Sequence, residues 1–213
     1  GGGPIGIELA QAFRRLGAEV TVVEGLPSIL SREEPEAQAA VTAVLEREGV
    51  VLRTGVKLTR VTAGPVLHLD DGSTVSGTHL LVAVGRTPTT GGFGLDLTGA
   101  KVDARKAVVT DKHLQAADTV WAAGDCTSPL QFTHVGFEQG RIAAKNAFGS
   151  ATKPGSRSTW DDRVVPWVTF TEPEVAHVGL TEAQAFEQHG DSVLVSYVPD
   201  SRADRPRTAG ETD

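Results

Sequence analysis

Three glycines at the start of the sequence constrain its fold more than any other feature. Gly1, Gly3 and Gly6 have the spacing G-x-G-x-x-G. In this pattern the first glycine permits a tight turn, the second lets the backbone approach a pyrophosphate, and the third lets a helix pack closely on a strand. The helix that follows directs its amide groups toward the phosphates. A flexible glycine-rich turn can have the same spacing, so the three glycines alone leave both interpretations open.

The residues after the glycines favour nucleotide binding. Apolar residues recur at helical spacing over 5–16, and Gly17 is placed to end that helix. Residues 19–23 predict a buried strand, which is followed by Glu24, 18 residues after Gly6. An acid about 20 residues beyond the glycines can hold the ribose hydroxyls of NAD. The order of glycines, helix, strand and acid predicts a dinucleotide-binding unit.

The composition narrows the class of protein. The 213 residues carry a formal net charge of −7, which disfavours nucleic acid as a partner. No apolar run reaches the roughly 18 residues that a membrane-spanning helix needs. The single cysteine, Cys126, permits no internal disulfide and no cysteine-based metal cluster. We therefore expect a cytoplasmic α/β chain with no membrane, nucleic-acid or metal partner. The lack of methionine, and of a strand ahead of the glycines, leads us to expect a fragment.

Further elements of the first domain follow in order. We expect a helix over 36–48, a strand over 50–52, a hairpin turned by Asp71 and Gly72, and an apolar strand over 80–84. With the glycine motif, these elements predict one nucleotide-binding domain over residues 1–85.

The middle of the sequence predicts short strands and an acidic residue at the end of one of them. Short strands are expected over 108–110 and 119–123, and Asp125 follows the second of them closely. An acid just after a buried strand lies at the carboxyl edge of a sheet, where ligands bind in open α/β folds. The alternative is a turn residue or a helix cap. A helix is expected over 135–148, and the Gly/Ser/Thr/Pro-rich residues 149–158 predict a boundary.

The last region has its own elements. Strands are expected over 164–170, 175–180 and 193–195. Between the last two, Thr181 and Gln184 have the spacing of a capping box that opens a helix.

Five stretches of the sequence stand out together: residues 1–8, 20–24, 83–88, 119–125 and 165–175. In their order and spacing they resemble the pyridine nucleotide-disulfide oxidoreductases, the flavoprotein family that includes mercuric reductase and dihydrolipoamide dehydrogenase. The resemblance implies an α/β fold in which Rossmann-like FAD- and NAD(P)-binding domains precede part of an α+β dimerisation domain. On this sequence it implies most of the NAD(P) domain at 1–85, the C-terminal part of the FAD domain at 86–155, and the start of the dimerisation domain at 156–213.

The resemblance also implies an activity. Members of the family pass hydride from NAD(P)H through FAD to a disulfide or metal-ion acceptor, as homodimers. Residues 8–13 and 32–35 are most similar to mercuric reductase. Residues 201–203 are as similar to dihydrolipoamide dehydrogenase as to mercuric reductase. A nucleotide-binding redox sensor without catalysis is a further alternative, because the family's pair of redox cysteines is not in this sequence. We expect the fragment itself to be inactive, and Cys126 to be a small packing residue.

Roles for individual residues follow from the resemblance as well. Glu8 would pair with a lysine beside the flavin, and Asp125 would bind the ribityl or ribose part of FAD. Backbone amides of 131–134 would face the flavin pyrimidine, whereas the His134 side chain has packing or capping as an alternative. Leu58 and Gly85 would line the nicotinamide nucleotide site. The residues expected to bind the cofactors FAD and NAD(H) or NADP(H) are Gly1, Gly2, Gly3, Pro4, Ile5, Gly6, Ile7, Glu8, Glu24, Leu58, Gly85, Asp125, Gln131, Phe132, Thr133 and His134.

Overall fold

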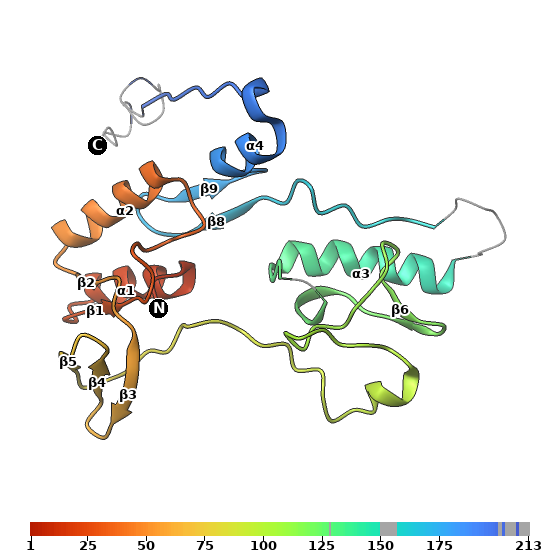
Figure 1. Cartoon of the computed structure of the whole chain (residues 1–213), viewed down its shortest axis with the longest axis horizontal. Helices are drawn as coiled ribbons and strands as arrows, with labels where there is room; N and C mark the ends of the chain where they lie inside the picture. Colours follow the sequence, from red (N-terminus) through yellow and green to blue (C-terminus); the bar gives the residue numbers. More distant parts are fainter. Residues whose placement is uncertain (128, 150–156, 200–201, 203–207, 209–213) are drawn as a thin grey trace. The chain divides into compact units, whose positions relative to one another are not determined.

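A computed structural model describes residues 1–127, 129–149, 157–199, 202 and 208 of the chain (Figure 1). Most of the expected boundary at 149–158, and two residues of the 201–203 stretch, lie outside these ranges. The chain divides into two compact units, residues 1–179 and 180–213. Each unit is described by itself.

The first unit begins with the expected helix. Helix α1 spans Pro4–Arg15, with Gly3 as its N-cap and Pro4 in its first turn. Proline suits that position because its missing N–H would have no helical partner there. Gly17 has a φ of 95°, the left-handed conformation that ends a helix and that glycine adopts without strain. The predicted helix and its end are therefore confirmed.

A β-α-β unit follows α1. Strand β1 (Thr21–Val23) pairs in parallel with β2 (Val51–Arg53), and helix α2 (Pro35–Arg47) connects them. Strand β1 is shorter than the predicted run over 19–23, whereas β2 and α2 each lie within one residue of their predicted ranges at both ends. Parallel neighbours joined by a helix are the arrangement that a dinucleotide-binding unit requires.

The core of this region packs between α1, β1 and α2. Its buried residues are Ile7, Ala10, Val22, Ile29, Leu30, Val41, Leu45 and Val50. The buried face of α1 is narrower than the apolar spacing predicted, because Ile5, Phe13 and Leu16 are largely exposed. A neighbouring part of the helix carries Gln11, which is buried through hydrogen bonds rather than apolar packing.

An antiparallel sheet continues the chain. Strands β3 (Leu58–Thr62), β4 (Val66–Leu69) and β5 (Thr74–Ser76) lie in sequence order, and Gly72 turns the β4–β5 hairpin with a φ of 83°. The hairpin predicted at Asp71 and Gly72 is confirmed, whereas β3 had no prediction.

The strand predicted over 80–84 is wrong. These residues are in neither helix nor strand, and Val82 and Val84 are 69% and 76% exposed. An apolar extended run forms a strand only where its N–H and C=O groups pair with a neighbouring strand, and no strand within the described residues pairs with this one. The Ala83 carbonyl lies against Gly1 instead.

The second half of the unit contains short elements and one long helix. A 3-10 helix, η1 (Leu95–Thr98), precedes an isolated bridge between Val102 and Val108, so the strand predicted over 108–110 is reduced to that bridge. The remaining elements are β6 (Gln115–Ala117), β7 (Val120–Trp121), the 3-10 helix η2 (Gly124–Cys126) and α3 (Thr133–Phe148). Leu114, Ile142 and Ala143 form their core, packed against Trp121, Ala123 and Trp160.

The unit closes with a hairpin. Strands β8 (Trp167–Thr169) and β9 (Val175–His177) pair antiparallel and are shorter than predicted. Strand β8 contacts α1, which brings the 165–175 stretch to the glycine motif from more than 150 residues away.

The second unit consists of helix α4 (Glu182–His189) and the 3-10 helix η3 (Gly190–Ser192) within its described part. The capping box of Thr181 and Gln184 is confirmed, with both reciprocal hydrogen bonds present. The strand predicted over 193–195 is wrong, because these residues have no strand partner among the described residues and Leu194 is 97% exposed.

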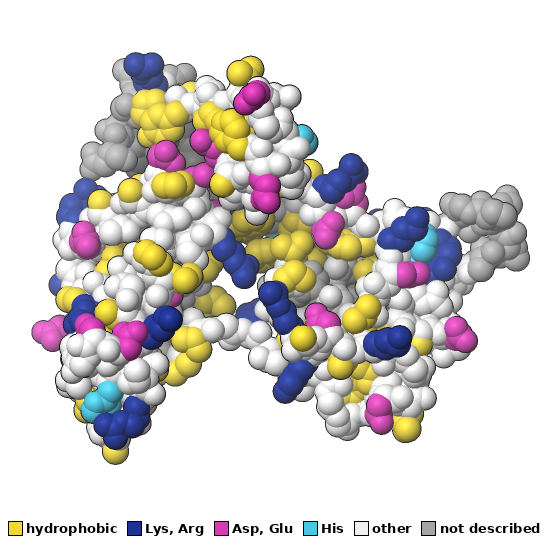
Figure 2. All heavy atoms as spheres, in the orientation of Figure 1, with side chains coloured by type: hydrophobic (Ala, Val, Ile, Leu, Met, Phe, Trp, Pro, Cys, Tyr) yellow, Lys and Arg dark blue, Asp and Glu magenta, His cyan; other side chains and the backbone are white. Residues whose placement is uncertain are grey.

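Apolar side chains are common on the described surface (Figure 2). Among the described residues, no helix is long and apolar enough to cross a membrane.

Candidate functional site

The glycine turn contains two kinds of glycine. A Cβ on Gly6 would overlap the Gly1 carbonyl, and one on Gly1 would overlap the Ala83 carbonyl, so packing within the chain requires glycine at both positions. At Gly3 a Cβ would meet no atom of the described residues within 4 Å, and the φ of −77° is open to any residue. The space beside Gly3, at the N-terminus of α1, is therefore free for a ligand to approach the backbone.

Glu24 is joined to this turn. Its Oε2 accepts a hydrogen bond of 2.5 Å from the Gly2 amide, and its Oε1 accepts one of 2.8 Å from the Leu26 amide. Burial of the carboxyl raises the pKa of Glu24, but the hydrogen bonds from the Gly2 and Leu26 amides lower it by more. The pKa therefore lies below its ordinary value of 4.5. A carboxylate that is ionised at neutral pH thus stands beside the glycine backbone.

Residues after β2 border the Glu24 segment. The Gly55 amide donates to the Leu26 carbonyl at 2.7 Å, and the Val56 amide donates to the Glu24 carbonyl at 3.2 Å. Leu58 begins β3 two residues later, where it pairs with Leu69. Gly85 follows the 83–84 contact with the glycine turn and has a φ of 129°. Leu58 thus lies close after the segment 55–56, which bonds to Glu24 and Leu26. Gly85 lies directly after the segment 83–84, which contacts Gly1.

The polar side of α1 holds the loop between β8 and β9. Glu8 Oε1 accepts a 2.8 Å hydrogen bond from the Phe170 amide. Gln11 binds Glu172 twice, donating to its carbonyl at 2.9 Å and accepting from its amide at 2.8 Å. One carboxylate oxygen of Glu8 is thus used by the chain itself, a contact that the sequence did not predict.

Asp125 lies in η2, as predicted just after a strand. Its carboxylate is half-exposed and Oδ2 lies 3.1 Å from Arg86 Nη1. Gln131 donates to the Asp125 carbonyl at 3.3 Å, and the Gly124 amide donates to Gln139 of α3 at 2.7 Å. These contacts hold the Asp125 turn against α3. The sequence analysis missed Arg86, although it follows Gly85 in one of the stretches that carry the resemblance.

Helix α3 begins two residues earlier than predicted. Thr133 and His134 therefore belong to its first turn instead of preceding it, and Phe132 is the N-cap. The first turn has no acidic residue, so the positive end of the helix dipole has no carboxylate there. The exposed His134 ring stacks on Phe132 at a centroid distance of 5.6 Å, which agrees with the packing alternative for its side chain.

A buried polar cluster was also missed. Trp167 Nε1 donates to Glu33 Oε1 at 2.7 Å, and His177 Nδ1 lies 3.1 Å from Glu33 Oε2. His177 Nε2 lies 2.9 Å from the Gly179 carbonyl. The Trp167 and His177 rings stack at 3.9 Å. The only sequence signal was a charged residue, Glu33, close after the apolar residues that precede α2.

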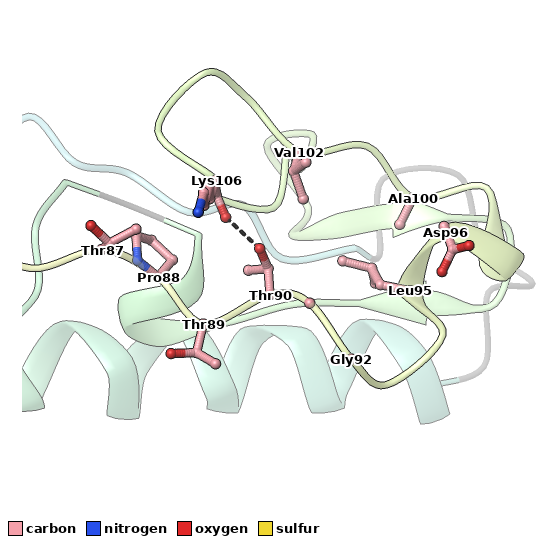
Figure 3. Close-up of a pocket in the computed structure, with 11 residues that line it drawn as sticks. Thr87, Pro88, Thr89, Thr90, Gly92, Leu95, Asp96, Ala100, Val102 and Lys106 are labelled. Atoms are coloured by element: carbon pink, nitrogen blue, oxygen red, sulfur yellow. Dashed lines mark hydrogen bonds between the residues drawn. The ribbon is translucent and has the colours of Figure 1, made fainter.

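A groove of about 680 Å³ opens on the segment after Gly85 (Figure 3). Thr90 and Lys106 approach each other in it, joined by a 2.7 Å hydrogen bond from Thr90 Oγ1 to the Lys106 carbonyl. None of the site residues predicted from the sequence lines it. Among the described residues, no group of three or more His, Cys, Asp or Glu side chains is placed to hold a metal ion.

Curated relatives span the chain almost completely. The chain is 38% identical over 198 residues to a mercuric reductase from Streptomyces lividans, a match that covers 88% of the chain and 40% of the relative. It is 37% identical over 219 residues to a dihydrolipoyl dehydrogenase from Thermus scotoductus, covering 99% of the chain and 46% of the relative. The chain thus spans less than half the length of these relatives.

Solved structures agree. A copper(II) complex of the HOCl-induced flavoprotein disulfide reductase RclA from Escherichia coli matches with a TM-score of 0.84 and 31% identity, covering all of the chain and 48% of that structure. LpdA from Mycobacterium tuberculosis matches with a TM-score of 0.87 and 29% identity, covering 99% of the chain and 45% of that structure. The mixed α/β fold is therefore that of flavoprotein disulfide reductases.

Two family models match separate parts of the chain. Residues 1–140 match the pyridine nucleotide-disulphide oxidoreductase model, and residues 165–213 match the dimerisation domain of the same family. Since the first match covers more than half of the sequence, the chain belongs to the pyridine nucleotide-disulphide oxidoreductase family.

Proposed function

We propose that the chain is part of an FAD-dependent oxidoreductase that passes hydride from NAD(P)H through FAD to a disulfide or metal-ion acceptor, in the manner of mercuric reductase. The observation that carries the proposal is the bond between Glu24 and the Gly2 amide. It sets an ionised acid beside an open glycine turn at a helix N-terminus, the combination that binds a dinucleotide.

The nucleotide would be held by the first β-α-β unit. The space beside Gly3 admits a pyrophosphate, and the amides at the start of α1 donate to it. Glu24 accepts hydroxyl hydrogen bonds from the ribose and repels a 2′-phosphate. Residues 25–30 contain no arginine that would attract such a phosphate. We therefore propose that NADH is preferred over NADPH, with Leu58 and Gly85 bordering the nicotinamide half.

FAD would lie against the second half of the first unit. The residues fit: the Asp125 carboxylate is accessible for a hydroxyl group, and Arg86 beside it keeps it oriented. The amides of residues 131–134, which lie just before and within the first turn of α3, would face the pyrimidine edge of the flavin, where negative charge develops on reduction. When bound, FAD supplies the hydride and electron chemistry, and the protein supplies position and charge. Residues 165–213 would belong to the interface of a homodimer.

The test is an anaerobic titration of the complete gene product with NADH, followed in the flavin absorbance band. Bleaching is expected to consume one equivalent of NADH per flavin, and one more for each redox disulfide that takes electrons from the flavin. A purified protein that has no flavin and does not bind NADH would contradict the proposal.

Dihydrolipoamide dehydrogenase is a second candidate, favoured by the 37% identity to the Thermus relative. A non-catalytic sensor is a third, because the single cysteine of this chain fits a sensor as well as it fits part of the enzyme. Steady-state assays with mercuric ion and with lipoamide as alternative acceptors separate the three, because the sensor would turn over neither.

A further inference from the structure

We infer that Trp167 and His177 of the β8–β9 hairpin are positioning residues for the loop 24–33, and that they set nucleotide affinity through Glu33. The inference rests on the proposed function, because the loop begins at the acid proposed to bind ribose. It adds a role for two residues that lie more than 130 positions away in the sequence.

Glu33 is where the hairpin holds the loop. Its carboxylate is among the most buried in the described chain, with the residue 6% exposed, and each oxygen has a separate partner from the hairpin. A buried carboxylate without partners is strongly unfavourable, so Glu33 stays where the Trp167 and His177 nitrogens meet it. Both neighbours of the His177 ring are acceptors, so the ring donates to both only when it carries two protons.

The geometry of the His177 side is fixed by stacking. The Trp167 and His177 rings are nearly parallel at 3.9 Å, with an interplanar angle of 12°. The Phe132 ring also stacks with Trp167, at a centroid distance of 6.0 Å and an interplanar angle of 7°. Because the rings restrain one another, the two nitrogens meet Glu33 as one preorganised unit.

Backbone hydrogen bonds connect Glu33 to the glycine turn. The Glu33 amide donates to the Leu30 carbonyl at 2.9 Å, and the Leu30 amide donates to the Gly2 carbonyl at 2.8 Å. Leu30 is buried and has a φ of 48°, a conformation that a non-glycine residue keeps only when its surroundings hold it. Gly2 in turn donates to Glu24. If Glu33 loses its partners, the backbone that orients Glu24 is therefore released.

The experiment measures dissociation constants of ADP-ribose and NADH for variants of the complete gene product. Trp167→Phe keeps the ring and removes the N–H donor. His177→Leu removes the other donor, and His177→Asn returns an amide donor near the Nδ1 position. Trp121→Phe is the matched control, since it removes a buried indole N–H from the other core cluster.

Trp167→Phe and His177→Leu are expected to raise both dissociation constants by about tenfold, the effect of losing one hydrogen bond to a charged group. His177→Asn should recover much of the affinity, Trp121→Phe should leave it unchanged, and kcat at saturating NADH should stay close to that of the unmutated protein. ADP-ribose lacks nicotinamide, so an equal change with both ligands locates the effect at the ribose loop.

A lowered melting temperature with unchanged dissociation constants would overturn the inference, because Trp167 and His177 would then be only structural. If Trp167→Phe does not fold, Glu33→Gln is the second variant, and an unchanged Kd in it has the same meaning. Failure of the unmutated protein to bind ADP-ribose would instead refute the proposed function, and is seen without any variant.

Discussion

Replacement of Glu24 by glutamine tests the nucleotide site most directly. The carboxylate has about four acceptor positions, and the Gly2 and Leu26 amides use two of them, so acceptor capacity remains for ribose hydroxyls. Glutamine has one oxygen in place of two. Its NH₂ group takes the place of the second oxygen and faces a donor that this oxygen had accepted from. At least one hydrogen bond to a charged group is lost, which contributes about 1.5–3 kcal/mol.

Glu24 is half-buried, so we take the lower end of this range, about 1.5 kcal/mol or about tenfold in the Kd of NADH. The Kd of NADPH should stay the same or fall, because the negative charge that repels its 2′-phosphate is gone. Fluorescence titrations with both nucleotides measure the two constants. Glu19→Gln, an exposed acid just before β1, is the control for charge alone. The reasoning fails if the unmutated protein binds NADPH at least as tightly as NADH, or if Glu24→Gln leaves the NADH constant unchanged.

Three further outcomes are expected. Gly3→Ser should leave the melting temperature unchanged or raise it, since serine is a preferred N-cap and its Cβ would meet no atom of the described residues. It should nevertheless weaken NADH binding by about 1–3 kcal/mol, because the side chain fills the space for the pyrophosphate. Undiminished binding by calorimetry would show that no ligand lies there. Asp125→Ala in the complete gene product should lose FAD during purification, read from the flavin absorbance, and full flavin occupancy with normal turnover would mean that Asp125 only shapes its turn. Residues 1–213 expressed alone should hold little FAD and reduce neither an artificial disulfide nor mercuric ion, because a single cysteine supplies no redox pair; stoichiometric flavin with turnover would contradict this.

The sequence predicted those parts of the fold that depend on nearby residues. The turn at Gly1–Gly6, helix α1 and the hairpin at Gly72 are encoded by local spacing and by residues with special backbone freedom. Residues 80–84 and 193–195 were predicted wrongly for one reason. Their composition favours an extended chain, but a strand also needs a partner, which composition does not report.

At the candidate site too, the sequence did not predict contacts between residues that are far apart in the chain. Glu24 was found because its distance from Gly6 is fixed by one helix and one strand. Asp125 was predicted as a site residue but its partner Arg86 was not, because 39 residues separate the two and no spacing rule joins them. Glu33 meets its partners across 134 and 144 residues, so only the folded chain could reveal that cluster.

The way α1 holds the β8–β9 loop has a consequence for how this family member can diverge. The hydrogen bonds of Glu8 and Gln11 to residues 170 and 172 go to main-chain atoms. The Phe170 side chain is exposed, and that of Glu172 adds an exposed ion pair with Arg15 at 3.6 Å, which contributes little, so both side chains can be replaced at small cost. A proline at either position would remove the N–H that α1 recognises, and an inserted residue would shift both out of register. Among homologues, loop length and the absence of proline at these two sites should therefore be kept more strictly than residue identity.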